Sequence, residues 1–324
     1  MVIAHNSRPP SSLPPPRPIF LAGPTAVGKS EIALALASRV GGEIISVDSM
    51  QVYRGLDIGT AKPTPAERAR VPHHLIDVAE LNETFDAARF VALARHAVKE
   101  IQLRGATPVL CGGTGLYFKA FLEGLGEAPP SDSALRATLE ASPLNELLRE
   151  LELHDPATFD TIDRRNPRRV IRAVEVIRLT GKPFSELRSN WNDTTCATEH
   201  AKRLFAFTRS GDNLHSRINA RVDAMFNRGL VEETGRLLAR GFETNSSAMQ
   251  AIGYRQVVEH LRGQRGLDET IQLVKTRTRQ FAKRQMTWFR RKLEVEWIEL
   301  DTSTATNQVV DRILARIRVV AAQS

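Results

Sequence analysis

Residues 18–30 read Pro-Ile-Phe-Leu-Ala-Gly-Pro-Thr-Ala-Val-Gly-Lys-Ser, and this stretch decides the fold. Its apolar part, 19–22, is too short for a helix and is bounded by Pro18 and Gly23, so it predicts a buried strand. The residues over 23–30 have the pattern Gly-x-x-x-x-Gly-Lys-Ser, and an Ala- and Leu-rich helical pattern follows them directly. Strand, glycine-rich loop and helix in this order are the context that a P-loop requires.

The P-loop pattern predicts a phosphate site. Its glycines let successive backbone N–H groups converge, and the start of a helix adds a partial positive charge. Lys29 adds a full charge, and the Ser30 hydroxyl is able to ligate Mg²⁺. A glycine-rich turn without a ligand is the weaker interpretation. We therefore predict that a di- or triphosphate binds to Gly23, Pro24, Thr25, Ala26, Val27, Gly28, Lys29 and Ser30.

The composition is that of an ordinary globular chain, with 324 residues of which 42% are hydrophobic and 25% charged. No apolar run approaches the roughly 20 residues that span a membrane, so we expect no membrane partner. Cys111 and Cys196 are too few for a disulfide framework or a four-ligand zinc site. Residues 1–17 are rich in proline and lack the apolar core of a signal peptide, which predicts a disordered tail. We therefore expect a cytoplasmic protein.

An acid lies at the end of the next predicted strand. The apolar run over 43–48 ends at Asp48, and ligands of doubly wound sheets lie beyond the carboxyl ends of the strands. Asp48 and the P-loop should therefore share one cleft. A further strand over 107–111 leads into Gly-Gly-Thr-Gly at 112–115, which either admits a ligand close to the backbone or is simply a tight turn.

The stretch 71–78 predicts a third strand, and it contains the adjacent His73 and His74. We favour local hydrogen bonds over a metal site for these two histidines, because nothing nearby supplies further ligands. A strand pattern returns only at 203–208, after a long run of helical spacing.

These patterns predict an α/β protein with a P-loop NTPase-like parallel sheet. The core comprises 18–127 and 200–324, and its C-terminal part is helical. A mostly helical insertion domain occupies 128–199.

Positive charge is concentrated in two segments of this chain, whose net charge is +8. Residues 164–172 contain five arginines and no acid, and 275–292 contain eight Lys and Arg residues and no acid. The second segment also contains Phe281, Trp288 and Phe289. Cations neutralise backbone phosphates and aromatic rings stack on unpaired bases, so we favour a nucleic-acid surface over a solvated helix face.

A P-loop with an acid at the next strand end permits two mechanisms. Asp48 accepts a proton from a substrate hydroxyl in a small-molecule kinase. In the other mechanism diphosphate leaves a carbon atom, and Asp48 activates an incoming amine or hydroxyl. Arg217 and Arg221 lie four apart on a predicted helix, where they are either diphosphate ligands or ordinary surface charge.

Seven segments resemble those that identify tRNA dimethylallyltransferases, also called tRNA isopentenyltransferases, in their short bacterial form. Two are highly specific: Ser-Val-Asp-Ser-Met-Gln-Val-Tyr-Arg-Gly-Leu-Asp-Ile-Gly-Thr-Ala-Lys-Pro at 46–63 and Lys-Arg-Gln-Met-Thr-Trp-Phe-Arg at 283–290. The others are 23–30, 72–77, 112–117, 166–176 and 251–256.

The resemblance implies transfer of a dimethylallyl group from dimethylallyl diphosphate to N6 of the adenosine 3′ of the anticodon, in tRNAs that read codons beginning with U. Thr25, Lys29 and Ser30 would belong to the diphosphate and Mg²⁺ site, and Asp48 would be the base at the adenine amine. Arg217 or Arg221 would hold the diphosphate, and the resemblance does not settle which.

The resemblance also implies that the chain binds the anticodon stem-loop of tRNA and flips the target base out of its stack. We expect a monomer, and we predict that ATP is not the substrate. The segments that resemble the family's tRNA contacts contain Asp48, Ser49, Met50, Gln51, Thr114, Arg136, Arg168, Arg169, Val170, Ile171, Arg172, Gln250, Ala251, Ile252, Gly253, Tyr254, Arg255, Lys283, Arg284, Gln285, Met286, Thr287, Trp288, Phe289 and Arg290.

Three alternatives remain from sequence. An adenylate isopentenyltransferase performs the same chemistry on free AMP or ATP, but it does not need the two basic segments. A P-loop kinase predicts ATP turnover. A nucleotide-switched RNA-binding protein would tolerate loss of the Asp48 carboxylate.

Overall fold

The computed structural model describes residues 15–187 and 203–322, and its chain divides into two compact units. Unit 1 comprises 1–118 and 198–324, and unit 2 comprises 119–197. This division begins earlier in the chain than the 127/128 boundary expected from sequence. Most of the proline-rich tail predicted over 1–17, and Cys196, lie outside the described residues.

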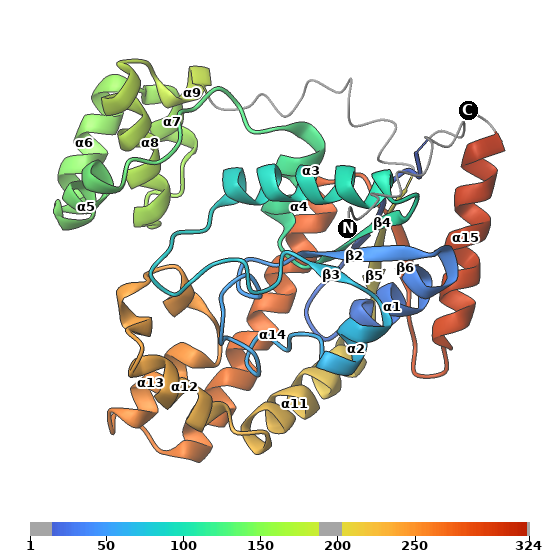
Figure 1. The fold of residues 1–324 in the computed structure, drawn as a ribbon. Coiled ribbons are helices and arrows are strands. Elements are labelled where there is room, and N and C mark those ends of the chain that lie inside the picture. Colours follow the sequence, from blue (N-terminus) through green and yellow to red (C-terminus); the bar gives the residue numbers. More distant parts are fainter. Residues whose placement is uncertain (1–14, 188–202, 323–324) are drawn as a thin grey trace, which may run out of the picture. The chain divides into compact units, whose positions relative to one another are not determined.

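Unit 1 is built on a six-stranded sheet in which every pairing is parallel. The strand order is β3-β2-β4-β1-β5-β6 (Figure 1). The predicted α/β fold with a parallel sheet is therefore confirmed. The strands are β1 (Ile19–Ala22), β2 (Gly42–Val47), β3 (His73–His74), β4 (Thr107–Gly112), β5 (Leu204–Thr208) and β6 (Glu296–Glu299).

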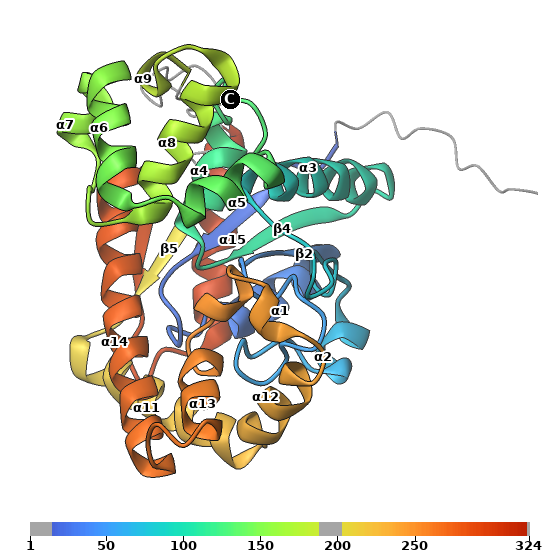
Figure 2. The same cartoon turned by 90° about the vertical axis from the view of Figure 1, so that its left-hand side faces the viewer.

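Helices cover both faces of this sheet, as Figures 1 and 2 show for α1 and α3. The central strand β1 is apolar on both faces, as expected inside a parallel sheet, and all four of its residues are buried. The helices of unit 1 are α1 (Lys29–Val40), α2 (Pro65–Arg70), α3 (Ala87–Leu103), α11 (Gly211–Asn227), α12 (Leu230–Leu238), α13 (Tyr254–Leu261), α14 (Leu267–Lys292) and α15 (Thr306–Ala322), with 3₁₀ turns η1 (Phe242–Thr244) and η2 (Ala248–Gln250). Helix α4 (Gly115–Glu123) crosses the boundary between the units.

The third strand is much shorter than the predicted 71–78. Leu75 and Asp77 have positive φ values of 60° and 58°, which interrupt the extended backbone after His74. His73 Nδ1 lies 2.7 Å from the Val71 carbonyl oxygen, and His74 Nε2 lies 2.6 Å from a Glu43 carboxylate oxygen. The prediction of local hydrogen bonds for the two histidines is confirmed.

Strand β6 was not predicted from sequence. It pairs with β5 at the edge of the sheet and includes only one fully buried residue, Ile298. A short edge strand in which apolar and polar residues alternate so weakly cannot be recognised from the hydrophobic pattern of the sequence.

Unit 2 is helical, with its own apolar core of Leu139, Leu147, Leu151, Val170 and Val174 among others. Its fully buried Glu175 accepts hydrogen bonds from Arg136 and Arg172. The helices within it are α5 (Ser133–Ala141), α6 (Leu144–His154), α7 (Pro156–Thr161), α8 (Pro167–Thr180) and α9 (Phe184–Leu187). In the described part of the chain, no helix of either unit is long and apolar enough to cross a bilayer.

Candidate active site

The polar segments that follow β1, β2, β4 and β5 meet at the carboxyl edge of the sheet in unit 1. Parallel neighbours end at the same edge, so Asp48 and the P-loop are brought together as predicted, and the Gly-Gly-Thr-Gly turn joins them there. The segment after β5 begins with Arg209, which the sequence analysis did not single out.

The P-loop after β1 has the backbone shape of an anion site. Gly23, Ala26 and Gly28 have positive φ values of 152°, 63° and 109°. Gly28 is the N-cap of α1 and offers no side-chain acceptor, so the first N–H groups of the helix lack a side-chain cap. The ammonium of Lys29 is held back against the loop, where its Nζ donates to the Pro24 carbonyl oxygen at 3.1 Å.

Burial lowers the pKa of Lys29, and Cys111 and Asp48 oppose this shift while Arg221 adds to it. The Cys111 thiol lies behind the loop, with its Sγ 3.7 Å from the Lys29 carbonyl oxygen. Burial raises the pKa of this thiol to about 11, so it is neutral at physiological pH. Cys111 is therefore a packing residue of the loop and not a nucleophile.

Asp48 is fixed through one oxygen of its carboxylate. Oδ1 accepts hydrogen bonds from the backbone N–H groups of Met50 at 2.8 Å and Gln51 at 3.2 Å. Among the described residues none donates to Oδ2, and the side chain is half-buried. The arrangement holds the carboxylate in one orientation and leaves the second oxygen available to a ligand.

Both arginines of α11 face this site. Arg217 is exposed, and its Nε donates to the Ala26 carbonyl oxygen of the P-loop at 2.9 Å. Arg221 lies deeper and directs Nη2 toward the Thr60 carbonyl oxygen at 3.5 Å. Burial lowers the pKa of Arg221 and the nearby Asp48 opposes this shift. Neither arginine is ordinary surface charge remote from the loop.

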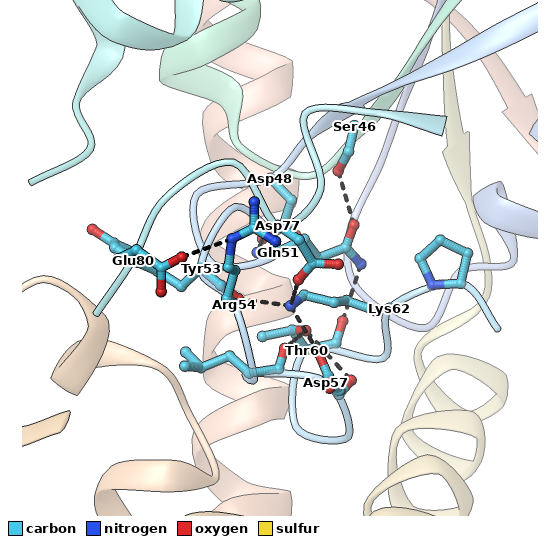
Figure 3. Close-up of polar contacts among 12 residues, drawn as sticks. Ser46, Asp48, Gln51, Tyr53, Arg54, Asp57, Thr60, Lys62, Asp77 and Glu80 are labelled. Carbon is cyan, nitrogen blue, oxygen red and sulfur yellow. Dashed lines mark hydrogen bonds and ion pairs between the residues drawn. The ribbon is translucent and has the colours of Figure 1, made fainter. Parts of the chain in front are cut away.

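The segment 46–63 folds into a loop that is held by its own side chains (Figure 3). The amide of Gln51 donates to the Thr60 carbonyl oxygen at 3.1 Å and accepts from the Ser46 hydroxyl at 2.8 Å. The ammonium of Lys62 is buried and contacts Asp57 at 2.8 Å and Asp77 at 2.5 Å. The loop that follows Asp48 is therefore ordered from both ends.

Helices α12 and α13 brace the tip of this loop. Glu233 accepts from the backbone N–H of Ile58 at 2.9 Å, and the Tyr254 hydroxyl donates to Glu233 at 2.5 Å. The same Tyr254 oxygen accepts from the Gly59 N–H at 3.0 Å. A Cβ on Gly59 would lie 2.4 Å from the Tyr254 ring, which explains why a glycine occupies this position. Sequence spacing could not reveal this bracing, because it joins segments far apart in the chain.

Helix α14 is fastened to the P-loop by Gln285. Its Oε1 accepts from the Thr25 N–H and its Nε2 donates to the Gly113 carbonyl oxygen, both at 2.9 Å. Trp288 lies so close to Gly115 that a Cβ there would be 2.1 Å from the indole ring. The Thr114 hydroxyl accepts from the Ser49 N–H at 3.1 Å.

Some of the residues predicted to contact tRNA are exposed in the structure and others are buried. Arg136 and Arg172 bond Glu175 of their own unit. The exposed members are Arg168, Arg169, Gln250, Arg255, Lys283, Arg284, Thr287 and Arg290. The buried ones are Val170, Ile171, Ala251, Gly253, Tyr254, Gln285 and Phe289, which lie inside their units and are closed to an RNA in this structure.

One face of α14 forms a hollow of about 500 Å³. Its lining combines cations with one aromatic ring and contains no acid. The lining residues are Gln280, Lys283, Arg284, Thr287, Trp288, Arg291 and Lys292.

The sequence model of the family described as IPP transferase matches residues 51–292. The chain belongs to this family. A tRNA dimethylallyltransferase from Citrifermentans bemidjiense is 45% identical over 89% of this chain and 94% of the relative. A tRNA dimethylallyltransferase from Geobacter metallireducens is 44% identical over 87% and 92%.

Solved structures of IPP transferases agree with the fold. The crystal structure of the full-length tRNA isopentenylpyrophosphate transferase from Bacillus halodurans is 39% identical, with a TM-score of 0.67 over 95% of this chain and 98% of that one. A eukaryotic dimethylallyltransferase, described as acting on tRNA, has a TM-score of 0.75 at 26% identity over 91% of this chain and 78% of its own. The resemblance inferred from sequence motifs is thus confirmed at the level of family and fold.

Proposed function

We propose that this chain transfers a dimethylallyl group from dimethylallyl diphosphate to N6 of the adenosine 3′ of the anticodon, in tRNAs that read codons beginning with U. The observation that carries the proposal is Asp48, whose Oδ1 is fixed by two backbone N–H groups while Oδ2 has no donor among the described residues. The carboxylate lies near enough to Lys29 and Arg221 to act on both of them electrostatically. The names of the relatives, tRNA dimethylallyltransferases, support the same reaction.

The exocyclic amine of adenine is a weak nucleophile, because its lone pair is delocalised into the ring. As the bond from N6 to the allylic carbon forms, Oδ2 of Asp48 accepts the amine proton. The bond from that carbon to the diphosphate oxygen breaks, and its electron pair leaves with the diphosphate. A base inside the anticodon stack cannot reach Asp48, so the adenosine is flipped out.

The leaving diphosphate gains charge, and the first N–H groups of α1 together with Lys29, Arg217 and Arg221 stabilise it. Because the Thr25 N–H is already bonded to Gln285, a Thr25 contact to the diphosphate comes from its hydroxyl.

The Ser30 hydroxyl would hold a Mg²⁺ ion beside the P-loop. The Ser30 side chain is exposed on the first turn of α1, and no hydrogen bond to it occurs among the described residues. Mg²⁺ prefers hard oxygen ligands and usually keeps several waters and phosphate oxygens. When bound, the ion would neutralise part of the diphosphate charge.

The α14 hollow and the exposed Arg168 and Arg169 of α8 are the proposed tRNA surfaces, each on its own unit. Cations there neutralise phosphates, and Trp288 offers a ring to an unstacked base. We further propose that the enzyme acts as a monomer in the cytoplasm, where its tRNA substrate is.

The test incubates the protein and Mg²⁺ with labelled dimethylallyl diphosphate and an unmodified tRNA that carries adenosine 3′ of its anticodon. Parallel reactions contain AMP in place of tRNA, or labelled ATP as the donor. We expect label in tRNA only. Asp48→Asn should lower the rate of transfer by about 10²- to 10⁴-fold, the usual contribution of a general base.

The matched control is Asp311→Asn, which makes the same change on α15 at an exposed ion pair with Arg39. It should transfer at the wild-type rate. Label in AMP alone would assign the free-nucleotide reaction, and ATP turnover without transfer would assign a kinase.

A further inference from the structure

Arg209 occupies a place at the P-loop that neither the motifs nor the proposed mechanism uses. It immediately follows β5, the parallel neighbour of β1, and its side chain is half-buried. Nε donates to the Val27 carbonyl oxygen of the P-loop at 2.7 Å. Nη1 donates to the Asp301 carbonyl oxygen at 2.8 Å and to the Asn213 amide oxygen at 3.1 Å.

These bonds fix the guanidinium plane and leave Nη2 without a partner among the described residues. Nη2 lies beside Gly28 of the loop. It lies 3.5 Å from the position that a Cβ on Gly28 would occupy, and the Nη2 atom of Arg217 lies 3.7 Å from the same position. Two arginines, one that precedes α11 and one within it, thus approach the same point beside Gly28, the N-cap of α1.

No acid balances this pair. In the residues that the structure covers, neither Arg209 nor Arg217 forms an ion pair with a carboxylate. Burial and the neighbouring Arg217 both lower the pKa of Arg209, while Asp301 and Glu31 only partly oppose the shift. Arg209 and Arg217 therefore repel each other, and an anion bound between them would relieve this repulsion.

We propose that Arg209 is a diphosphate ligand, which forms with Arg217 a two-guanidinium clamp across the mouth of the P-loop. This inference rests on the proposed function, because it assigns a further residue to the leaving group of that reaction. Arginine suits the role, since its planar fork uses three N–H groups for positioning and retains others for the phosphate. The clamp also relieves the repulsion between the two arginines when the ligand binds.

The alternative is that Arg209 only braces the loop, because its carbonyl contacts alone would stabilise that shape. Binding of inorganic pyrophosphate distinguishes these two roles of Arg209. It is measured by calorimetry on the full chain in the presence of Mg²⁺. The variants are Arg209→Gln, Arg209→Lys and the matched control Arg95→Gln, an exposed arginine on α3.

We expect Arg209→Gln to weaken pyrophosphate binding by about tenfold or more, the loss typical of one hydrogen bond to a charged group. Arg209→Lys should recover part of this loss, because it keeps the charge but not the fork. The KM for dimethylallyl diphosphate should rise in parallel, and Arg95→Gln should bind pyrophosphate as the wild type does.

If Arg209 only braces the loop, Arg209→Gln would lower the melting temperature, but its dissociation constant for pyrophosphate would stay at the wild-type value. This result would overturn the proposal. Absence of pyrophosphate binding to the wild type would also overturn it. If the wild type binds pyrophosphate but transfers nothing to tRNA, the proposed reaction fails, and the binding comparison still supports or overturns the role of Arg209.

Discussion

At the scale of single residues, Asp77 shows how charge holds the loop beside the active site. Burial opposes ionisation of this carboxyl, but hydrogen bonds from Lys62 and Arg68 outweigh it and lower the pKa of Asp77. The Lys62 ammonium is itself buried, so it depends on its carboxylate partners. An acid with a lowered folded-state pKa stabilises the fold above its unfolded pKa, and this contribution is lost as the pH falls through the folded value.

We therefore predict that Asp77→Asn lowers the free energy of unfolding at pH 7 by about 1–3 kcal/mol, the cost of leaving a buried partner unsatisfied. The difference from wild type should shrink as the pH falls below about 4, the ordinary pKa of an Asp, because the carboxyl of the unfolded wild type is protonated there, and it should vanish once the pH is below the lowered folded-state pKa. Urea unfolding at a series of pH values measures both. Glu80→Gln, which removes the partner of the exposed Arg54, is the control and should change little at any pH. A pH-independent difference for Asp77→Asn would contradict the prediction.

At the scale of elements, α12 and α13 position the loop that carries Gln51 and Thr60. The Glu233–Tyr254 pair holds the loop tip, and Gly59 fits against the Tyr254 ring with no room for a Cβ. Gly59→Ala should therefore lower the free energy of unfolding by about 1–3 kcal/mol, as overpacking does. It should also lower the transfer rate, since displaced loop atoms move Gln51 away from Asp48.

A glycine-to-alanine substitution within α12 should have the opposite effect on the free energy of unfolding. Gly235 lies inside the helix with no atom near its Cβ position, so Gly235→Ala should raise the free energy of unfolding by about 0.5–1 kcal/mol. Thermal unfolding of the two variants side by side checks both. Equal effects would mean that contact with Tyr254 does not decide the outcome.

Sequence reasoning succeeded for elements whose signal is local. The strand, loop and helix around Lys29 follow one another in the chain, and Asp48 ends the next strand, so the shared edge follows from topology alone. The strand predicted over 71–78 was wrong beyond His74, because the left-handed backbone at Leu75 leaves no trace in hydropathy. The fastening role of Gln285 could not be predicted, because it depends on a contact between residues 260 positions apart.

At the scale of the whole molecule, the net charge of +8 matters for binding because it is concentrated in segments without acidic residues. Many arginines elsewhere are paired with carboxylates, such as Arg178 with Glu150 and Arg316 with Glu296. Along the α14 hollow, Lys283 and Arg291 are exposed and have no carboxylate partner among the described residues. An acid-free stripe of this kind attracts polyanions over a distance of about 10 Å at 0.1 M salt.

If tRNA binds along this stripe, its affinity falls with salt in proportion to the number of phosphates that are neutralised. We predict that Lys283→Gln and Arg291→Gln each weaken tRNA binding and each reduce the slope of log K against log salt by about 0.7–0.9. Filter binding or fluorescence anisotropy over a range of salt concentrations measures the slope. Lys99→Gln, which removes an exposed charge from α3, is the matched control and should leave the slope unchanged. If all three variants reduced the salt slope equally, net charge alone would explain the effect, and the prediction would be wrong. A reduced slope in the two α14 variants only would locate the RNA backbone on that helix.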